Sequence, residues 1–344
     1  MRRGAGPYLV TRTHGLRTHL MKPTDMQILA RAKTLRDVLD SLLKTDYAVE
    51  MSQLPTQGRD ATTLEDIFLK RLVERFFFVR RAAQGKMQDL LTRYCARFEV
   101  ENIKRVVRAK HGGQSTEAPN LIPLPREYTL VNFQALLKAK DMDEVASLLR
   151  ETQYNPILER LQPYKETGAT MILEAVLDKI YFSKVWELVS KIHGTKDLIG
   201  EEIDLRNLLT IFSLKTRDIS ARLIEDATIP LTYALPKTTL QSLLQSRLEE
   251  APNILGTRYS KLASEVLNLL RSGAPFPMEW VFFKQLYNDA SATLMTQPLQ
   301  AGYVIAYLLQ CECEAKDLVS IVTGKQLNMN EEDILKGLFG IYRE

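Results

Sequence analysis

The chain has 344 residues, of which 45% are hydrophobic and 26% charged, a composition typical of a folded protein with two or three domains. Its longest nearly unbroken apolar run, residues 303–309, is far shorter than the roughly 20 residues that span a bilayer, so we predict no membrane-spanning helix. The net charge of +4 hides an asymmetry, because residues 1–110 carry 22 Lys and Arg against 12 Asp and Glu. This asymmetry indicates nucleic acid, anionic headgroups or an acidic protein as a partner, without choosing among them.

Most of the chain has helical periodicity. In chain order, the clearest apolar stripe is formed by Leu64, Ile67, Phe68, Leu69 and Leu72, which recur at steps of three and four residues as one buried helix face requires. Turn-forming residues interrupt the helical pattern at 55–59, 111–125, 163–168, 230–236 and 273–277. We therefore predict an all-α fold.

Motifs for catalysis or cofactor binding are missing. The Gly-Lys pairs at 85–86 and 324–325 lack the glycine and the Ser/Thr that complete a phosphate-binding loop. The four histidines are scattered, and Cys311-x-Cys313 has no second pair of ligands. We predict no catalytic residue, no metal, no cofactor and no small-molecule substrate. An enzyme whose carboxylates have no recognisable spacing remains an alternative, and a pocket with strongly shifted acid pKa values would reveal it.

Cellular location can be predicted from the cysteines and from the first residues. Three cysteines cannot form a disulfide framework, which favours a reducing compartment. The opening MRRGAGPYLV has basic residues without the apolar segment of a secretory signal. We expect the protein in the cytoplasm.

An internal repeat of about 107 residues is the most informative pattern in the sequence. An acid recurs at Glu99, Asp204 and Glu314. An Asn or Asp follows three residues later, and a lysine eleven residues later, on the same helix face. These are Asn102, Asn207 and Asp317, then Lys110, Lys215 and Lys325. Four apolar positions also coincide: Phe98, Ile203 and Cys313; Ile103, Leu208 and Leu318; Val106, Ile211 and Ile321; Val107, Phe212 and Val322.

A second helix repeats upstream with a similar period. Leu64-Glu65, Leu173-Glu174 and Met278-Glu279 are followed five residues later by Lys70, Lys179 and Lys284. Two helices that match in order favour a true triplication, with copies at 1–120, 121–232 and 233–344. The apolar positions are predicted to be core, while the acid and Asn/Asp pairs are predicted to form hydrogen bonds between helices that fix their registry.

Several segments together resemble a known family. They are TRTHGLRTHLM (11–21), TLRDVLDSLLKTDY (34–47), FEVEN (98–102), IDLRN (203–207) and the segment CECEAKDLVSIVTGKQLNMNEEDI (311–334). In this order and with the threefold period, the chain resembles the C subunit of archaeal A-type rotary ATPases, called subunit d in the vacuolar enzyme. Asp317 departs from the Asn of the first two copies, so its polar contacts need not be identical.

The resemblance implies three similar helical domains in a pseudo-threefold funnel. It implies a subunit without its own active site, peripheral on the cytoplasmic face of the membrane. There it would couple the shaft subunits D and F to the membrane rotor ring of c or K subunits, and so transmit torque for proton or sodium transport. The resemblance carries over no catalytic or metal residue, and it leaves the partner contacts unassigned.

A helical nucleic-acid-binding protein is the alternative from a different class. The basic first third interleaves arginines with Phe76, Phe77, Phe78 and Tyr94, which could stack on bases. On a helix, however, at least one of three consecutive phenylalanines must enter the core. Under the family interpretation no nucleic acid is bound, and four arginines are offered as surface candidates for partner binding: Arg71, Arg75, Arg80 and Arg81.

Overall fold

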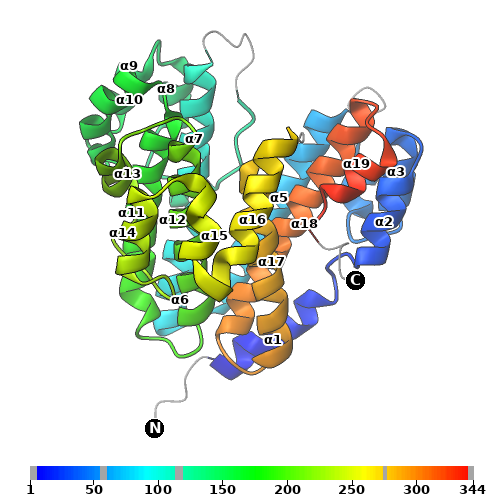
Figure 1. Ribbon diagram of the computed structural model, residues 1–344. Helices are drawn as coiled ribbons and strands as arrows, with labels where there is room; N and C mark the ends of the chain where they lie inside the picture. Colours follow the sequence, from blue (N-terminus) through cyan, green and yellow to red (C-terminus); the bar gives the residue numbers. More distant parts are fainter. Residues whose placement is uncertain (1–5, 55–59, 113–118, 274–276, 340–344) are drawn as a thin grey trace. The chain divides into compact units, whose positions relative to one another are not determined.

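The computed structural model describes residues 6–54, 60–112, 119–273 and 277–339. Over these ranges the chain is helical and has no strand, which confirms the predicted all-α class. The predicted break at 55–59 lies outside the described residues, as do parts of the breaks at 111–125 and 273–277. The predicted break at 230–236 lies between two helices, Ala221–Ala227 and Lys237–Gln245. The predicted break at 163–168 was wrong for most of its length, because residues 163–167 belong to the helix Leu161–Thr167 and only Gly168 follows it, with a left-handed φ of 66°. Figure 1 shows the helices in chain order.

Two compact units make up the chain, and the first combines its two ends. This first unit comprises residues 1–84 and 287–344. Its helices are α1 (Gly6–Arg17), α2 (Pro23–Arg31), α3 (Leu35–Leu42), α4 (Ala48–Ser52), α5 (Ala61–Ala82), the end of α17 (Met278–Thr296), α18 (Gly302–Gln326) and α19 (Glu331–Lys336).

Residues 85–286 form the second unit. Its α-helices are α6 (Gly85–Cys95), α7 (Arg97–His111), α8 (Phe133–Lys138), α9 (Met142–Leu148), α10 (Leu161–Thr167), α11 (Thr170–Val189), α12 (Lys196–Lys215), α13 (Ala221–Ala227), α14 (Lys237–Gln245), α15 (Ala251–Ile254), α16 (Gly256–Ser272) and the start of α17. Three short 3-10 helices accompany them: η1 (Arg126–Tyr128), η2 (Asn155–Arg160) and η3 (Leu248–Glu250).

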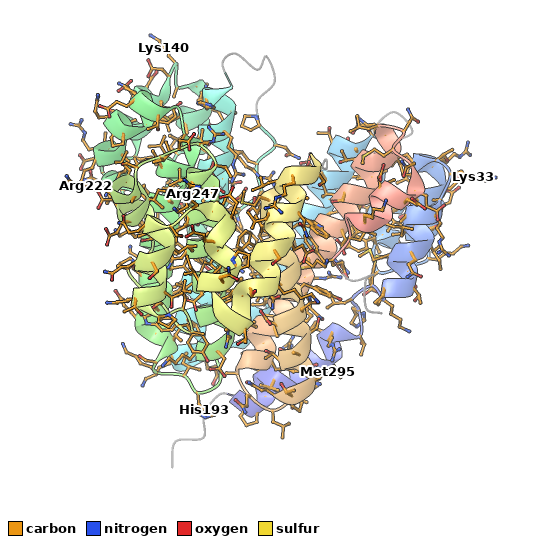
Figure 2. All side chains as sticks on the ribbon, in the orientation of Figure 1. Lys33, Lys140, His193, Arg222, Arg247 and Met295 are labelled. Atoms are coloured by element: carbon orange, nitrogen blue, oxygen red, sulfur yellow. The ribbon has the colours of Figure 1, made fainter. Side chains whose placement is uncertain are left out.

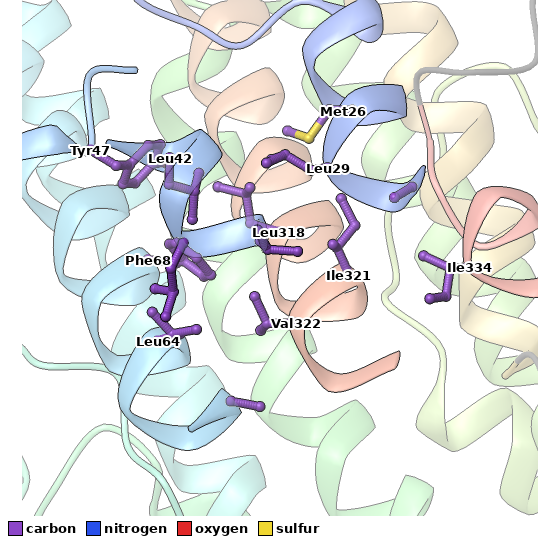
Figure 3. Packing of buried hydrophobic residues seen from close by; sticks show 14 of the residues in the cluster. Met26, Leu29, Leu42, Tyr47, Leu64, Phe68, Leu318, Ile321, Val322 and Ile334 are labelled. Atoms are coloured by element: carbon purple, nitrogen blue, oxygen red, sulfur yellow. The ribbon is translucent and has the colours of Figure 1, made fainter. Parts of the chain in front are cut away.

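The core of the first unit lies between α5 and α18. Helix α18 is apolar on nearly all sides and therefore needs neighbours all round, which α2, α3, α5 and α19 supply. Figure 3 shows Leu64 and Phe68 of α5 facing Leu318 and Val322 of α18. The predicted stripe on α5 is confirmed, since Leu64, Phe68, Leu69 and Leu72 are buried and Ile67 is partly buried.

In the second unit α11 packs against α6, α7 and α12. All twelve apolar residues that the repeat aligns are buried, which confirms their prediction as core. Phe76, Phe77 and Tyr94 are also buried. These three aromatic rings therefore stabilise the fold and are not available to stack on nucleic-acid bases.

No described helix is long and apolar enough to cross a membrane. The copy boundaries near residues 120 and 232 stay a prediction.

A glycine inside α12 allows a close contact that the sequence does not reveal. At Gly200 a Cβ atom would lie 2.4 Å from Cγ of Tyr233 and 2.6 Å from its Cβ. Tyr233 cannot easily retreat, because its backbone N–H donates to Asp204. We expect Gly200→Ala to lower the free energy of unfolding by about 1–3 kcal/mol, although Gly→Ala inside a helix ordinarily raises it by about 1 kcal/mol.

Thermal unfolding of Gly200→Ala beside Gly15→Ala measures this difference. Gly15 lies in α1 with nothing near its missing Cβ, so its alanine variant should be as stable as the parent or more so. If both variants were equally stable, the contact with Tyr233 would not limit residue 200.

Candidate functional site

The three repeated acids are all buried, and each holds a loop against its own helix. Glu99 on α7 accepts hydrogen bonds from the backbone N–H of Leu130 at 2.5 Å and of Val131 at 3.2 Å. The Tyr154 hydroxyl donates to its second oxygen at 2.7 Å. Burial raises the pKa of Glu99, although these donors act in the opposite direction.

Asp204 on α12 is surrounded by the same kinds of donor as Glu99, with one more backbone N–H group. It accepts from the backbone N–H groups of Tyr233, Ala234 and Leu235 at 2.6–2.9 Å. The Tyr259 hydroxyl lies 3.3 Å from one carboxylate oxygen. Burial raises the pKa of Asp204 against the effect of these hydrogen bonds.

Glu314 on α18 receives its partners from the beginning of the chain. The backbone N–H of Met21 and the Tyr47 hydroxyl each donate to it at 2.7 Å. Arg75 of α5 forms an ion pair with the same carboxylate, and both side chains are at most 10% exposed. The prediction of Arg75 as a surface residue was therefore wrong, because its guanidinium neutralises a buried acid.

The other arginine candidates differ in exposure. Arg71 is partly buried and pairs with Glu50 at 3.0 Å. Arg80 is partly exposed, and Arg81 is exposed. Only the last turn of α5 therefore presents an arginine of this set openly to solvent.

The residue three positions after each acid holds a second backbone segment. Asn102 exchanges two hydrogen bonds with the backbone of Ile122, at 2.7 and 2.9 Å. Asn207 does the same with Ile229, at 2.7 and 3.1 Å. Asp317 accepts a hydrogen bond from the N–H of Phe339 at 3.0 Å. The predicted partners were neighbouring helices, but these partners lie mostly in loops.

The repeated lysines stand at helix ends. Lys110 donates to the carbonyl of Leu137 at 2.9 Å, in the last turn of α8. Lys215 donates to the carbonyls of Leu244 and Ser246, at the end of α14. Both interactions place a cation on carbonyl groups that a helix terminus leaves free. Lys325 is half-buried, and burial lowers its pKa while the nearby Glu331 raises it.

Three tyrosines complete the acid sites, and the repeat search missed them. They are Tyr47, Tyr154 and Tyr259, and their hydroxyls all point at the repeated acids. A Thr-x-Tyr pattern at 45–47, 152–154 and 257–259 carries the signal. In the first two copies the threonine hydroxyl accepts the tyrosine N–H, an arrangement that fixes the turn from which the ring extends.

Ion pairs connect four helices of the second unit, and the first of them is buried. Lys104 of α7 lies 2.6 Å from Asp178 of α11, with both side chains at most 5% exposed. Arg206 of α12 lies 3.6 Å from Asp178 and 3.6 Å from Glu279 of α17. The buried charges of Lys104 and Asp178 must be paired, while Arg206 is 19% and Glu279 39% exposed. The four side chains form one series of ion pairs.

The repeated carboxylates are already occupied by hydrogen bonds within the fold. Each repeated carboxylate already accepts at least three hydrogen bonds, so few lone pairs remain for a substrate. A pocket between α12 and α17 is lined by Leu205, Leu209, Phe282, Phe283 and Leu286 with Glu202, Arg206 and Glu279. Glu202 in this pocket is paired with Arg97. Among the described residues no group of three or more His, Cys, Asp or Glu could hold a metal ion.

Comparison with known proteins gives matches over nearly the whole chain. The family model described as ATP synthase (C/AC39) subunit matches residues 9–337. The C subunit of the A-type ATP synthase of Methanocaldococcus jannaschii is 23% identical over 336 residues, which cover 95% of this chain and 84% of the relative. The protein of the same name from Pyrococcus horikoshii is 26% identical, with 91% and 85% covered. That of Archaeoglobus fulgidus is 23% identical, with 96% and 95% covered.

Proposed function

Because this chain belongs to the ATP synthase (C/AC39) subunit family, we propose that it is a non-catalytic central-stalk subunit of a rotary ATPase. It couples the shaft subunits D and F to the membrane rotor ring of c or K subunits. Its place is the cytoplasmic face of the membrane, where it transmits torque between ATP chemistry and ion transport. The family match over residues 9–337 is the observation that carries this proposal.

The proposal includes three copies, at 1–120, 121–232 and 233–344, around a pseudo-threefold axis. The partners of the acids support it. Glu99 is bound by Leu130 and Tyr154 of the second copy. Asp204 is bound by residues of the third copy, and Glu314 by Met21 and Tyr47 of the first. Each copy thus donates a loop and a tyrosine to the acid of the copy before it, and the first closes on the last.

Hydrogen bonds and ion pairs that join each copy to the next would stiffen a subunit that transmits torque. A torque adaptor must resist shear between its helices, and buried charge pairs have strong geometric requirements. The chain of charges from Lys104 to Glu279 crosses four helices, so a relative shift of any two would separate paired charges. Close-packed cores add low compressibility.

Reconstitution tests this function directly. The purified chain is mixed with the rotor ring in detergent and with the shaft subunits D and F, separately and together. We expect it to bind both at once, and to restore ATP-driven ion transport to a complex from which it was removed. Calorimetric titration of the chain alone with magnesium ATP should detect no binding.

Binding to neither ring nor shaft would overturn the proposal, as would micromolar ATP binding by the chain alone. Ion transport that recovered fully without the chain would also contradict a coupling role.

A further inference from the structure

Three segments of the first unit meet at one end of α18. Helices α5 and α18 run antiparallel, because the Ala61 N–H donates to Gln326 at 2.6 Å while Arg75 pairs with Glu314 further along. The last turn of α5, with Arg80 and Arg81, is therefore at the same end as the turn between α17 and α18. Figure 1 shows α1 crossing this end.

Helix α1 is fixed to both of the other segments. The His14 Nε2–H donates to the carbonyl of Pro298 at 2.7 Å, and its ring stacks on Tyr303 with 3.9 Å between centroids. On the α5 side, the Arg12 guanidinium lies 4.5 Å from the centre of the Phe78 ring. These contacts make α1, the end of α5 and the α17–α18 turn one continuous surface.

Exposed apolar side chains project from this surface. Leu299 in the turn is 85% exposed, and Met295 one helical turn earlier is 70% exposed. Tyr8 on α1 is 65% exposed. Figure 2 labels Met295, which lies close to α1 within the first unit. We call the set Tyr8, Arg12, Arg81, Met295 and Leu299 the basic end surface.

Its charges have one sign. Residues 6–17, 76–84 and 290–311 contain Arg12, His14, Arg17, Arg80 and Arg81 but no Asp or Glu, and the acids Asp289 and Glu312 stand just outside the last of these ranges. Arg12 is exposed and donates to the neutral Tyr8 hydroxyl at 2.9 Å, so that contact does not neutralise it. Arg81 is exposed at the end of α5. The surface combines cations with protruding apolar groups, and these segments supply no anion of their own.

We propose that the basic end surface binds the headgroup region of an anionic phospholipid bilayer. Arg12 and Arg81 contact lipid phosphates, and Leu299 and Met295 enter the boundary between headgroups and acyl chains. Cationic side chains beside protruding apolar ones are the pattern by which proteins lie on anionic membranes without spanning them. Stacking on single-stranded nucleic acid uses several aromatic faces along a groove, whereas Phe76 and Phe77 of this region are buried and Tyr8 is the exposed aromatic residue of the set.

Vesicle flotation tests the proposal with the full chain and does not require the ring or the shaft. One set of vesicles is pure phosphatidylcholine, and the other contains about one third phosphatidylglycerol. We expect binding to the anionic set only, weakening as salt rises because the Debye length shrinks. Arg12→Gln and Arg81→Gln should each weaken binding about fivefold, and Leu299→Gln about tenfold.

Matched controls come from the same unit but from other surfaces. Arg36→Gln removes an exposed arginine of α3, and Leu327→Gln an apolar side chain that is 67% exposed beyond the opposite end of α18. Both should bind vesicles as the parent does, and circular dichroism should show every variant folded.

Equal binding to both kinds of vesicle, or none to anionic vesicles at low salt, would overturn the lipid proposal. So would equal losses in the controls and in the variants of the basic end surface. If the chain bound the ring and shaft subunits but no vesicles, the lipid proposal would be wrong and the proposed function would be unaffected. Binding to the ring that Leu299→Gln abolished, without vesicle binding, would assign the surface to a protein partner instead.

Discussion

Replacing Glu314 by glutamine is expected to lower the free energy of unfolding by about 3–5 kcal/mol, because it leaves a buried arginine without its counter-ion. Arg75 is 10% exposed, and Glu314 is the carboxylate with which it pairs. Glutamine keeps the size of the side chain. Its one carbonyl oxygen can accept from the Met21 N–H, and its NH2 group can donate to the Tyr47 hydroxyl, so both positions stay hydrogen-bonded. The loss therefore reports the charge rather than packing. Urea unfolding followed by circular dichroism measures it.

Glu99→Gln is the matched control for this variant. Glu99 sits in the same kind of site, but its described donors are two amides and a tyrosine rather than an arginine. Burial already raises its pKa, so a neutral side chain avoids the cost of burying a charge. We expect a loss of about 1 kcal/mol or less. Equal losses in the two variants would mean that Arg75 does not depend on Glu314.

A comparable loss is expected for Asp178→Asn in the second unit. Lys104 is almost fully buried at 2.6 Å from Asp178, and Arg206 lies 3.6 Å from the same carboxylate. Asparagine removes the negative charge that the buried Lys104 and the partly buried Arg206 share. The expected loss in the free energy of unfolding is about 3–5 kcal/mol, measured by urea unfolding.

A double-mutant cycle with Lys104→Met separates pairing from burial. The double variant removes the charges of both Lys104 and Asp178. Arg206 still has its ion pair with Glu279. The double variant should therefore be more stable than Asp178→Asn alone, with a coupling energy of about 0.5–3 kcal/mol. Strictly additive losses would show that the two charges do not stabilise each other.

The sequence by itself determined the helical class and much of the core. Apolar residues at helical spacing form one face of a helix, and that face is buried because exposing it to water is unfavourable. All twelve aligned apolar positions are buried. The repeat also placed Glu99, Asp204 and Glu314 on helices, since periodicity is a local property of the chain. The tyrosines could have been found in the same way, because Thr-x-Tyr recurs with the same period.

Only the tertiary structure decided which groups these acids hold. A buried carboxylate must find donors, but nothing local in the sequence says that Glu314 takes them from Met21 and Tyr47, more than 260 residues away. For the same reason Arg75 looked like a surface charge, since an arginine on a helix has the same local pattern whether it faces water or a buried acid. Hydrogen bonds between residues so far apart in the sequence depend on how the fold brings the two ends of the chain together. Periodicity within one helix carries no information about which distant segment will pack against it.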